Sequence, residues 1–316
     1  MLEIAAEAAR LWGFEAAQVT LAARRENVVF RVAGAAGDCA LRLHRPGYRS
    51  DAELASELDW MHALAAGGLD VPDPVARPGG GYLARVGGHQ VDVLGWVPGA
   101  PLGRAGELQG VADRAGFCRQ LGAAMARLHD ISDAWARPEG FARPSWDRAG
   151  LLGETPLWGR FWEHPQLKPG ERALLERVRQ AADPVLARLE GDADYGLIHA
   201  DLLSENMLRD GERVWMIDFD DGGWGFREFE LATFLLRFED APDYADLRAA
   251  LVEGYAARRA VKAEELDLFL LLRALTYPGW IAERLGEPGA QERSDRAIAT
   301  ATRSAWRWLE TYGGNP

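Results

Sequence analysis

The chain has 316 residues, 48% of them hydrophobic, which is enough to fill the cores of two domains or of one two-lobed protein. Its net charge of −12 disfavours general binding to nucleic acids, because that binding needs clustered basic side chains. The sequence shows no membrane-spanning stretch and no signal peptide, and its two cysteines, Cys39 and Cys118, are too few for a disulfide framework, so we expect a cytoplasmic protein.

Residues 1–97 are predicted to form a small β-rich lobe with one main helix. That helix covers residues 51–68, where Leu54, Leu58 and Met61 form one apolar stripe before a pair of glycines. Short runs rich in β-branched and aromatic residues surround it, separated by turn residues. The runs read VTLA, NVVFRVAG, CALRLHR, YLARV and QVDVLGWV.

Residues 98–316 are predicted to form a larger, mainly helical lobe. Helical periodicity covers residues 107–130 and 171–190, and three further helical stretches are predicted between residues 228 and 312. Residues 195–223 interrupt the helices with two β-like runs, NMLR and VWMID, joined by an Asp-Gly turn. The pattern therefore predicts an α+β protein of two lobes.

The segment 199–206 reads HADLLSEN, and Asp218 follows Asn206 by twelve positions. Transfer of a phosphoryl group needs an aspartate that accepts or orients the hydroxyl proton, an amide oxygen that binds a hard cation, and a second carboxylate that bridges this cation to the phosphates. The spacing predicts these roles for Asp201, Asn206 and Asp218, with Mg²⁺ as the cation, while His199 braces the loop. The alternative is a hairpin whose Asp and Asn side chains only cap turns.

These motifs resemble those of the aminoglycoside phosphotransferase and choline kinase superfamily, whose members are relatives of the protein kinases. In that family H-G/A-D-x4-N forms the catalytic loop, here residues 199–206, and I-D-F/W-x-D forms the metal loop, here residues 217–221. The runs PLWGRFW, MIDFDDGGWGFREFELATFL and PGWIAERL resemble the branch that holds homoserine-kinase-like proteins and the stress-response Ser/Thr kinase. The resemblance spans nearly the whole chain and implies a protein-kinase-like fold with ATP as phosphate donor.

The resemblance also implies a nucleotide site in the β-rich lobe. Arg42 stands where the family pattern usually has a lysine, and it could hold a phosphate or pair with a carboxylate. Glu57 is the better partner for it, because it borders the apolar stripe of its helix, whereas Glu53 lies further towards solvent. The alternatives are an outward strand arginine and a solvated helix glutamate.

Two further parts of the nucleotide site are expected from backbone groups. The amides of residues 25–28, around Asn27, would cover the phosphates without a glycine-rich loop. By resemblance, a backbone C=O and N–H at Gly95 and Val97 would pair with the base.

The acceptor side has only weak candidates. Glu205, Asp220 and Asp221 could form an acidic rim that holds an amine, or they could be solvated residues. Trp224 and Trp280 could offer indole faces to a cation, although core packing is the more frequent role of tryptophan.

We therefore expect an ATP- and Mg²⁺-dependent kinase that phosphorylates a hydroxyl of a small molecule, such as an amino alcohol, an aminoglycoside or other antibiotic, or a homoserine-like metabolite. One alternative is a protein Ser/Thr kinase of the stress-response type. Another is a nucleotide-binding pseudokinase, suggested by the glycine-free loop and by Arg42. The sequence leaves the acceptor, the choice between ATP and GTP, and the oligomeric state open.

Overall fold

The computed structural model divides into two compact units that interleave along the chain. Unit 1 consists of Met1–Arg104, Asp130–Arg143 and Ser204–Asp220, and unit 2 of the remaining three segments. The predicted division into continuous lobes, 1–97 and 98–316, is simpler and stays a prediction. The structure describes residues 1–14, 18–24, 27–34, 37–104, 106–191, 194–262 and 265–312.

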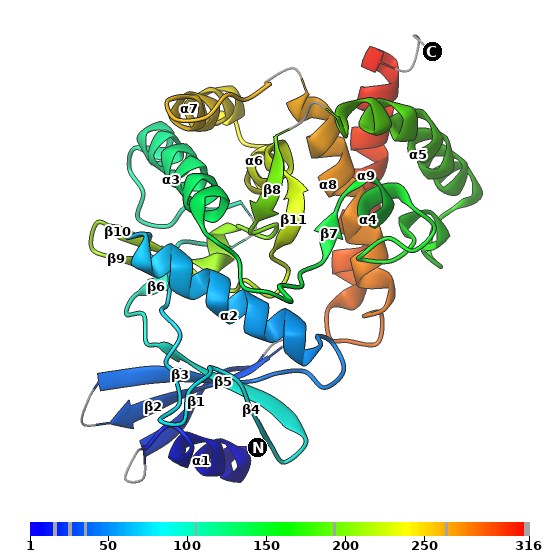
Figure 1. Ribbon diagram of the computed structural model, residues 1–316. Helices are drawn as coiled ribbons and strands as arrows, with labels where there is room; N and C mark the ends of the chain where they lie inside the picture. Colours follow the sequence, from blue (N-terminus) through cyan, green and yellow to red (C-terminus); the bar gives the residue numbers. More distant parts are fainter. Residues whose placement is uncertain are drawn as a thin grey trace. The chain divides into compact units, whose positions relative to one another are not determined.

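An antiparallel five-stranded sheet forms the first part of unit 1, with the order β1-β2-β3-β5-β4 (Figure 1). Alternate residues of its strands face opposite sides. One side packs against the helix α1 (Leu2–Arg10), whose small residues Ala5, Ala8 and Ala9 are buried in this core. The strands are β1 (Gln18–Arg24), β2 (Val28–Gly34), β3 (Gly37–Leu43), β4 (Ala84–Val86) and β5 (His89–Gly95).

The helix α2 (Asp51–Ala66) begins and ends where the sequence predicts. Ser50 and Glu53 form a reciprocal capping box at its amino end, and Gly67 follows its last turn. Trp60, in the middle of the helix, is fully buried and donates its indole N–H to Ser132 Oγ at 2.8 Å. This anchoring holds α2 against the other segments of unit 1.

The hairpin predicted around the Asp-Gly turn is also present in unit 1. The strands β9 (Met207–Asp210) and β10 (Arg213–Met216) pair around Gly211, which has a positive φ of 61°. The short strand β6 (Ala100–Pro101) pairs with the other edge of β9. The single-turn helix η2 (Ser204–Asn206) leads directly into this hairpin.

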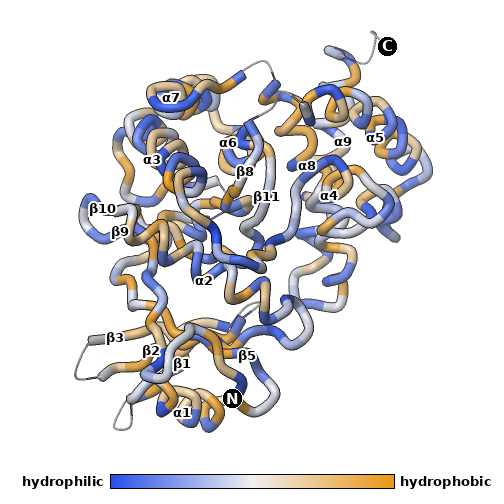
Figure 2. Tube along the Cα trace, in the orientation of Figure 1, coloured by the Kyte–Doolittle hydropathy of each residue, from blue (hydrophilic) through white to orange (hydrophobic). Residues whose placement is uncertain are grey.

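Unit 2 is mainly helical, and α8 runs through its core. Most side chains of α8 are buried, and Figure 2 shows the helix coloured as largely hydrophobic. A three-stranded sheet in the order β7-β11-β8 lies in the same unit. Its strands are β7 (Ser145–Trp146), β8 (Tyr195–Ile198) and β11 (Gly223–Phe226). The helices are α3 (Arg114–Ala134, from Asp130 on in unit 1), α4 (Arg148–Leu152), η1 (Phe161–Glu163), α5 (Pro169–Leu189), α6 (Arg227–Leu235), η3 (Leu236–Phe238), α7 (Tyr244–Ala256), α8 (Leu266–Ala282) and α9 (Ala290–Tyr312).

The predicted α+β class is confirmed, with a β-rich amino-terminal sheet and a helical carboxy-terminal part. Three details were wrong. The β-rich part carries α1 besides its main helix, and α3 begins at Arg114 because Asp113 accepts the N–H of Gly116 and so starts the helix there. The described part of residues 227–312 holds four α-helices rather than three.

Candidate active site

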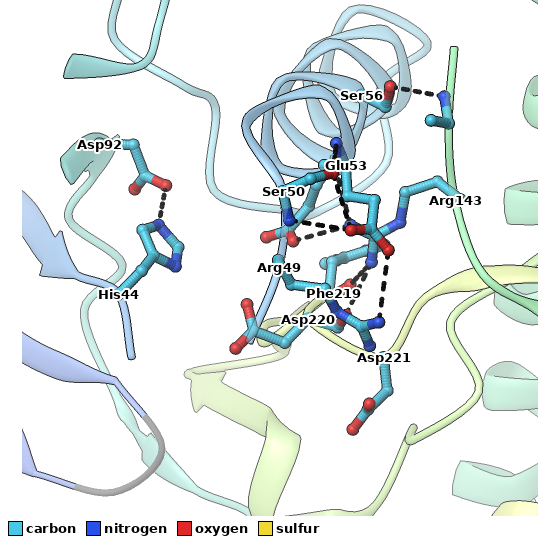
Figure 3. A network of polar contacts seen from close by, with 12 residues as sticks. His44, Arg49, Ser50, Glu53, Ser56, Asp92, Arg143, Phe219, Asp220 and Asp221 are labelled. Atoms are coloured by element: carbon cyan, nitrogen blue, oxygen red, sulfur yellow. Dashed lines mark hydrogen bonds and ion pairs between the residues drawn. The ribbon is translucent and has the colours of Figure 1, made fainter. Parts of the chain in front are cut away.

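A buried ion-pair network in unit 1 is centred on Arg42 of β3. Arg42 lies opposite Asp92 in the register of β3 and β5, so both side chains share one face of the sheet. Its Nε and Nη2 each donate to one oxygen of Asp92 at 2.8 Å, and its Nη1 donates to Oε1 of Glu57 at 3.0 Å. The ring of His44 lies 2.6 Å from the same Asp92 carboxylate (Figure 3). The predicted pairing of Arg42 with Glu57 is therefore present.

The charges of this network depend on one another. Burial alone would lower the pKa of Arg42, but Asp92 and Glu57 raise that pKa well above its ordinary value. Burial would likewise raise the pKa values of Asp92 and Glu57, yet both are lowered, chiefly by Arg42. The pKa of His44 is raised, because Asp92 outweighs the effect of burial. Arg42, Asp92 and Glu57 thus favour their charged forms because of one another, so the loss of one leaves the others uncompensated.

The two expected metal ligands, Asn206 and Asp218, both belong to unit 1. Asn206 is buried, and its backbone oxygen accepts the N–H of Ile217 at 2.9 Å. Asp218, the residue after Ile217, is exposed, and its φ of 67° lies in the left-handed region. That conformation costs a non-glycine residue on the order of 1–3 kcal/mol, so the surrounding structure must hold it.

Asn27 and Asp220 also meet in unit 1. The Asn27 side chain donates to Asp220 Oδ2 at 2.6 Å, and its oxygen accepts the backbone N–H of Arg45 at 3.3 Å. The other oxygen of Asp220 lies 3.9 Å from Arg42 Nη1. The structure thus brings Asp220, a candidate for the acceptor side, together with residues expected at the nucleotide. The neighbouring residues 25–26 lie outside the part that the structure describes.

The expected base-pairing residues, Gly95 and Val97, line a cavity of about 410 Å³ in unit 1. The Gly95 N–H is donated to the carbonyl of Asp73 at 2.8 Å. Trp96 and Trp215 also line this cavity.

In unit 2, the expected catalytic residue Asp201 is held by Arg273 of α8. Arg273 is fully buried and donates through Nη2 to Asp201 Oδ1 at 2.5 Å. It also donates to the carbonyl of Ala200 at 3.2 Å and to the hydroxyl of Tyr277 at 3.2 Å. Ala200 is the second non-glycine residue with a positive φ, 64°, among the described residues. Arg273 therefore fixes both the carboxylate of Asp201 and the strained backbone before it.

Glu230 of α6 holds the same loop from another direction. Its Oε2 accepts the backbone N–H of His199 at 2.5 Å. Because Glu230 is fully buried, its pKa is raised to about 7, although hydrogen bonds from the amides of His199 and Ala200 oppose the rise. His199 itself is buried. The loop is thus braced through backbone bonds as well as by packing.

Among the acceptor-side candidates, Asp221 lies in unit 2, with Asp201. Its carboxylate accepts the indole N–H of Trp158 at 3.4 Å, and the Arg273 guanidinium stacks over the ring of Trp158 at 4.6 Å. Asp221 and Asp201 are therefore linked through one aromatic ring and one cation. The face of Trp280 packs against a protein cation, since the Arg284 guanidinium lies 4.4 Å from its ring.

The remaining two candidates, Glu205 and Trp224, make contacts of a different kind. Glu205, in unit 1, accepts a hydrogen bond from the hydroxyl of Ser204 at 3.2 Å. Trp224 is half-buried in β11 and donates its backbone N–H to the carbonyl of Pro144 at 2.8 Å.

Sequence reasoning missed three buried charged residues that organise these groups: Asp92, Arg143 and Arg273. Two of them carry a signal, because Asp92 and Arg273 are isolated charges inside otherwise apolar runs, QVDVLGWV and FLLLRALT. Arg143 precedes a proline in a connecting segment, where nothing in the pattern marks it. Its side chain contacts Glu57. It also donates to the backbone carbonyl of Phe219 in the metal loop (Figure 3).

The model of the phosphotransferase enzyme family matches residues 18–264. The chain belongs to this family. A homoserine kinase from Sinorhizobium fredii is 29% identical over 255 residues, which cover 78% of this chain and 72% of that protein. A homoserine kinase from Acidiphilium cryptum is 30% identical, with 78% and 73% covered.

Solved structures of other kinases resemble this phosphotransferase. A microcompartment-associated aminopropanol kinase has a TM-score of 0.83 and 30% identity, with 98% of each chain covered. An amicoumacin kinase bound to AMP-PNP and Ca²⁺ has a TM-score of 0.71 at 20% identity, covering 90% of this chain and 88% of that one, which shows the shared fold. Together with the family match, these relatives indicate that the protein is a kinase. The amicoumacin kinase, for its part, binds a nucleotide analogue together with a divalent cation.

Asn206 of the catalytic loop and Asp218 of the metal loop suit such a cation. They carry an amide and a carboxylate oxygen, the donors that hard divalent cations prefer. The part of the chain that the structure describes has no cluster of three or more His, Cys, Asp or Glu side chains that could hold a metal. Two protein oxygens with nucleotide phosphates and water fit a cation that arrives with the nucleotide.

Among the described residues, no helix has the length and apolarity needed to cross a membrane.

Proposed function

We propose that the protein is an ATP- and Mg²⁺-dependent kinase that phosphorylates the hydroxyl of a small amino alcohol. The observation that carries this proposal is the similarity to the aminopropanol kinase, which extends over 98% of both chains. The pairing of the loop carboxylate Asp201 with Arg273 supports it, because a fixed carboxylate can orient one hydroxyl towards the phosphate.

The residues of unit 1 would serve the nucleotide and the metal. Asn206 and Asp218 would hold Mg²⁺, which neutralises the charge that develops on the phosphates when it is bound. Arg42, fixed by Glu57 and Asp92, would place a cation beside the phosphates. The segment at Asn27 would cover the phosphates with backbone amides. Backbone groups of the strand end at residues 95–97 would pair with the base.

The residues of unit 2 would serve the acceptor. Asp201 would accept or orient the hydroxyl proton. Asp221 is the best candidate for the ammonium group of an amino alcohol, because it is linked to Asp201 through Trp158 and Arg273. Asp220 is a weaker candidate, since it is engaged by Asn27.

Homoserine is the second candidate acceptor, since several relatives about 28–30% identical are homoserine kinases. Homoserine adds a carboxylate to the amine and the hydroxyl, so it would need a cation on the acceptor side. The comparisons give no support to a protein Ser/Thr kinase. A pseudokinase would bind the nucleotide without transfer, so a turnover assay decides that alternative.

The test is ADP release with Mg-ATP and a panel of acceptors: aminopropanol, ethanolamine, choline, homoserine, an aminoglycoside and a protein substrate. We expect the highest kcat/KM for an amino alcohol. The Asp201→Asn variant should bind Mg-ATP but lose most of the transfer, because an amide cannot accept the proton; general-base groups contribute about 10²–10⁴-fold. A wild-type rate in this variant would refute the role of Asp201, and a preference for homoserine or protein would refute the proposed acceptor.

A further inference from the structure

Arg143 lies in unit 1 between the helix α2 and the metal loop. Its side chain is completely buried and donates to the Glu57 carboxylate at 3.2 Å and to the carbonyl of Glu53 at 3.0 Å. Its Nη2 donates to the carbonyls of Phe219 and Asp220, both at 2.8 Å (Figure 3). One guanidinium thus connects a helix to two successive backbone carbonyls of the loop.

Only an arginine can make this set of contacts. Its planar guanidinium carries five N–H donors in a fixed arrangement, whereas lysine offers three donors from a single nitrogen. Glu57 divides its two oxygens between two arginines, since Oε1 accepts from Arg42 and Oε2 from Arg143. Glu57 is therefore the bridge between the arginine expected at the phosphates and the arginine at the metal loop.

The backbone that Arg143 holds follows directly after the expected metal ligand. Asp218 has a φ of 67°, a strained conformation that persists only where neighbouring contacts enforce it. The carbonyls of the next two residues are those that accept from Arg143. A second contact holds the same segment, because the ring of Phe219 packs edge-on against Trp60 of α2 at 5.2 Å.

We propose that Arg143 is a positioning residue that ties the metal loop to Glu57 of α2 and so sets the Asp218 carboxylate for the divalent cation. This inference rests on the proposed function of Asp218 as a metal ligand. Without Arg143 the loop can relax towards an ordinary backbone conformation, which moves the carboxylate of Asp218. The part of nucleotide binding that depends on the metal should then weaken, while the metal-independent part stays.

The test compares binding of AMP-PNP with and without Mg²⁺, by titration calorimetry, to the wild type and to Arg143→Lys. Outer residues that orient metal ligands are worth about 10–100-fold in metal affinity, so we expect binding of Mg-AMP-PNP to weaken by at least about tenfold. Binding of AMP-PNP in EDTA should change less than about twofold, and the Mg²⁺ concentration needed for half-maximal kcat should rise. Arg137→Lys, in the same connecting segment but exposed, is the matched control.

Three outcomes overturn the inference. If Arg143→Lys binds Mg-AMP-PNP as the wild type does, the loop does not need Arg143. If binding weakens equally with and without Mg²⁺, Arg143 has only a general structural role. If the wild type shows no metal-dependent binding, the proposed function fails and takes this inference with it. Should Arg143→Lys not fold, judged by its circular dichroism, Arg143→Gln takes its place, because its amide can still donate to one carbonyl.

Discussion

Arg42 directs its three side-chain nitrogens at two different carboxylates, and this geometry accounts for an arginine where the family pattern usually has a lysine. Asp92 accepts hydrogen bonds from Nε and Nη2, and Glu57 accepts one from Nη1. A single ammonium group cannot make the bidentate contact to Asp92 and also reach Glu57. Asp92 and Arg42 therefore form a matched pair on the sheet, and substitution of either one alone leaves a buried charge without its partner.

We predict that Asp92→Asn lowers the free energy of unfolding by about 3–5 kcal/mol, the usual cost of removing one partner from a buried ion pair. The expected loss is large because both Asp92 and Arg42 are buried, and because His44 uses the same carboxylate. Urea denaturation measures the change. The variant should also bind ATP more weakly, since Arg42 would no longer be fixed.

A matched pair on the same sheet provides the control. Asp38 of β3 pairs with Arg31 of β2, but their side chains are 28% and 50% exposed. Asp38→Asn should therefore cost less than about 1 kcal/mol. If the two substitutions have equal effects, burial does not set the energetics of the Asp92 pair.

Among the elements, α6 combines a structural and an electrostatic role. Its residue Glu230 accepts a backbone N–H of the catalytic loop, and burial raises its pKa to about 7. The folded protein thus favours the protonated carboxyl, whereas the unfolded chain has an ordinary pKa. The stabilisation from this group is complete below the unfolded pKa and is lost as the pH rises through about 7.

We predict that the free energy of unfolding of the wild type falls between pH 5 and pH 8, and that Glu230→Gln reduces this fall. The full contribution of one such group is on the order of 3 kcal/mol. Glu228, on the same helix, also has a pKa raised to about 7 by burial. It therefore contributes to the same fall in the free energy of unfolding, and Glu228→Gln measures its share. Urea denaturation across this pH range measures both. An unchanged slope in Glu230→Gln would show that Glu230 does not titrate in this range.

The sequence predicted those elements whose signals are local. Runs rich in β-branched and aromatic residues located β3 and β5, and the apolar stripe that ends before two glycines located α2. The helix α1 was missed because its buried face consists of alanines, which make a weak apolar pattern although they allow close packing on the sheet.

The candidate site was predicted from spacing, and its supporting contacts were not. Asp201, Asn206 and Asp218 follow from a motif within twenty residues of the chain. Arg143 and Arg273 act from segments far from that motif, at sequence separations of 76 and 72 residues from the groups that they hold. Such long-range hydrogen bonds depend on tertiary packing, which no local pattern records.

For the whole molecule, the chain passes between the two units inside the motif itself. It leaves unit 2 after Leu203 and enters unit 1 at Ser204, and it returns to unit 2 at Asp221. The residues expected to bind metal therefore belong to unit 1, whereas Asp201 belongs to unit 2. This division predicts that nucleotide binding and catalysis can be separated by substitution.

We predict that Mg-AMP-PNP stabilises the wild type and Asp201→Asn to the same extent, but stabilises Asp218→Ala much less. At about 100 times the dissociation constant, a ligand of the folded state adds about 2.7 kcal/mol to the free energy of unfolding. Thermal melting with Mg-AMP-PNP, with AMP-PNP in EDTA, and without ligand separates the metal-dependent part of this gain. Chelation should reduce the rise in melting temperature that the nucleotide gives the wild type to the rise seen in Asp218→Ala, because the nucleotide then binds both proteins without the metal. Equal stabilisation of Asp218→Ala and the wild type by Mg-AMP-PNP would remove Asp218 from the metal site, and a loss of stabilisation in Asp201→Asn would contradict its assignment to the acceptor.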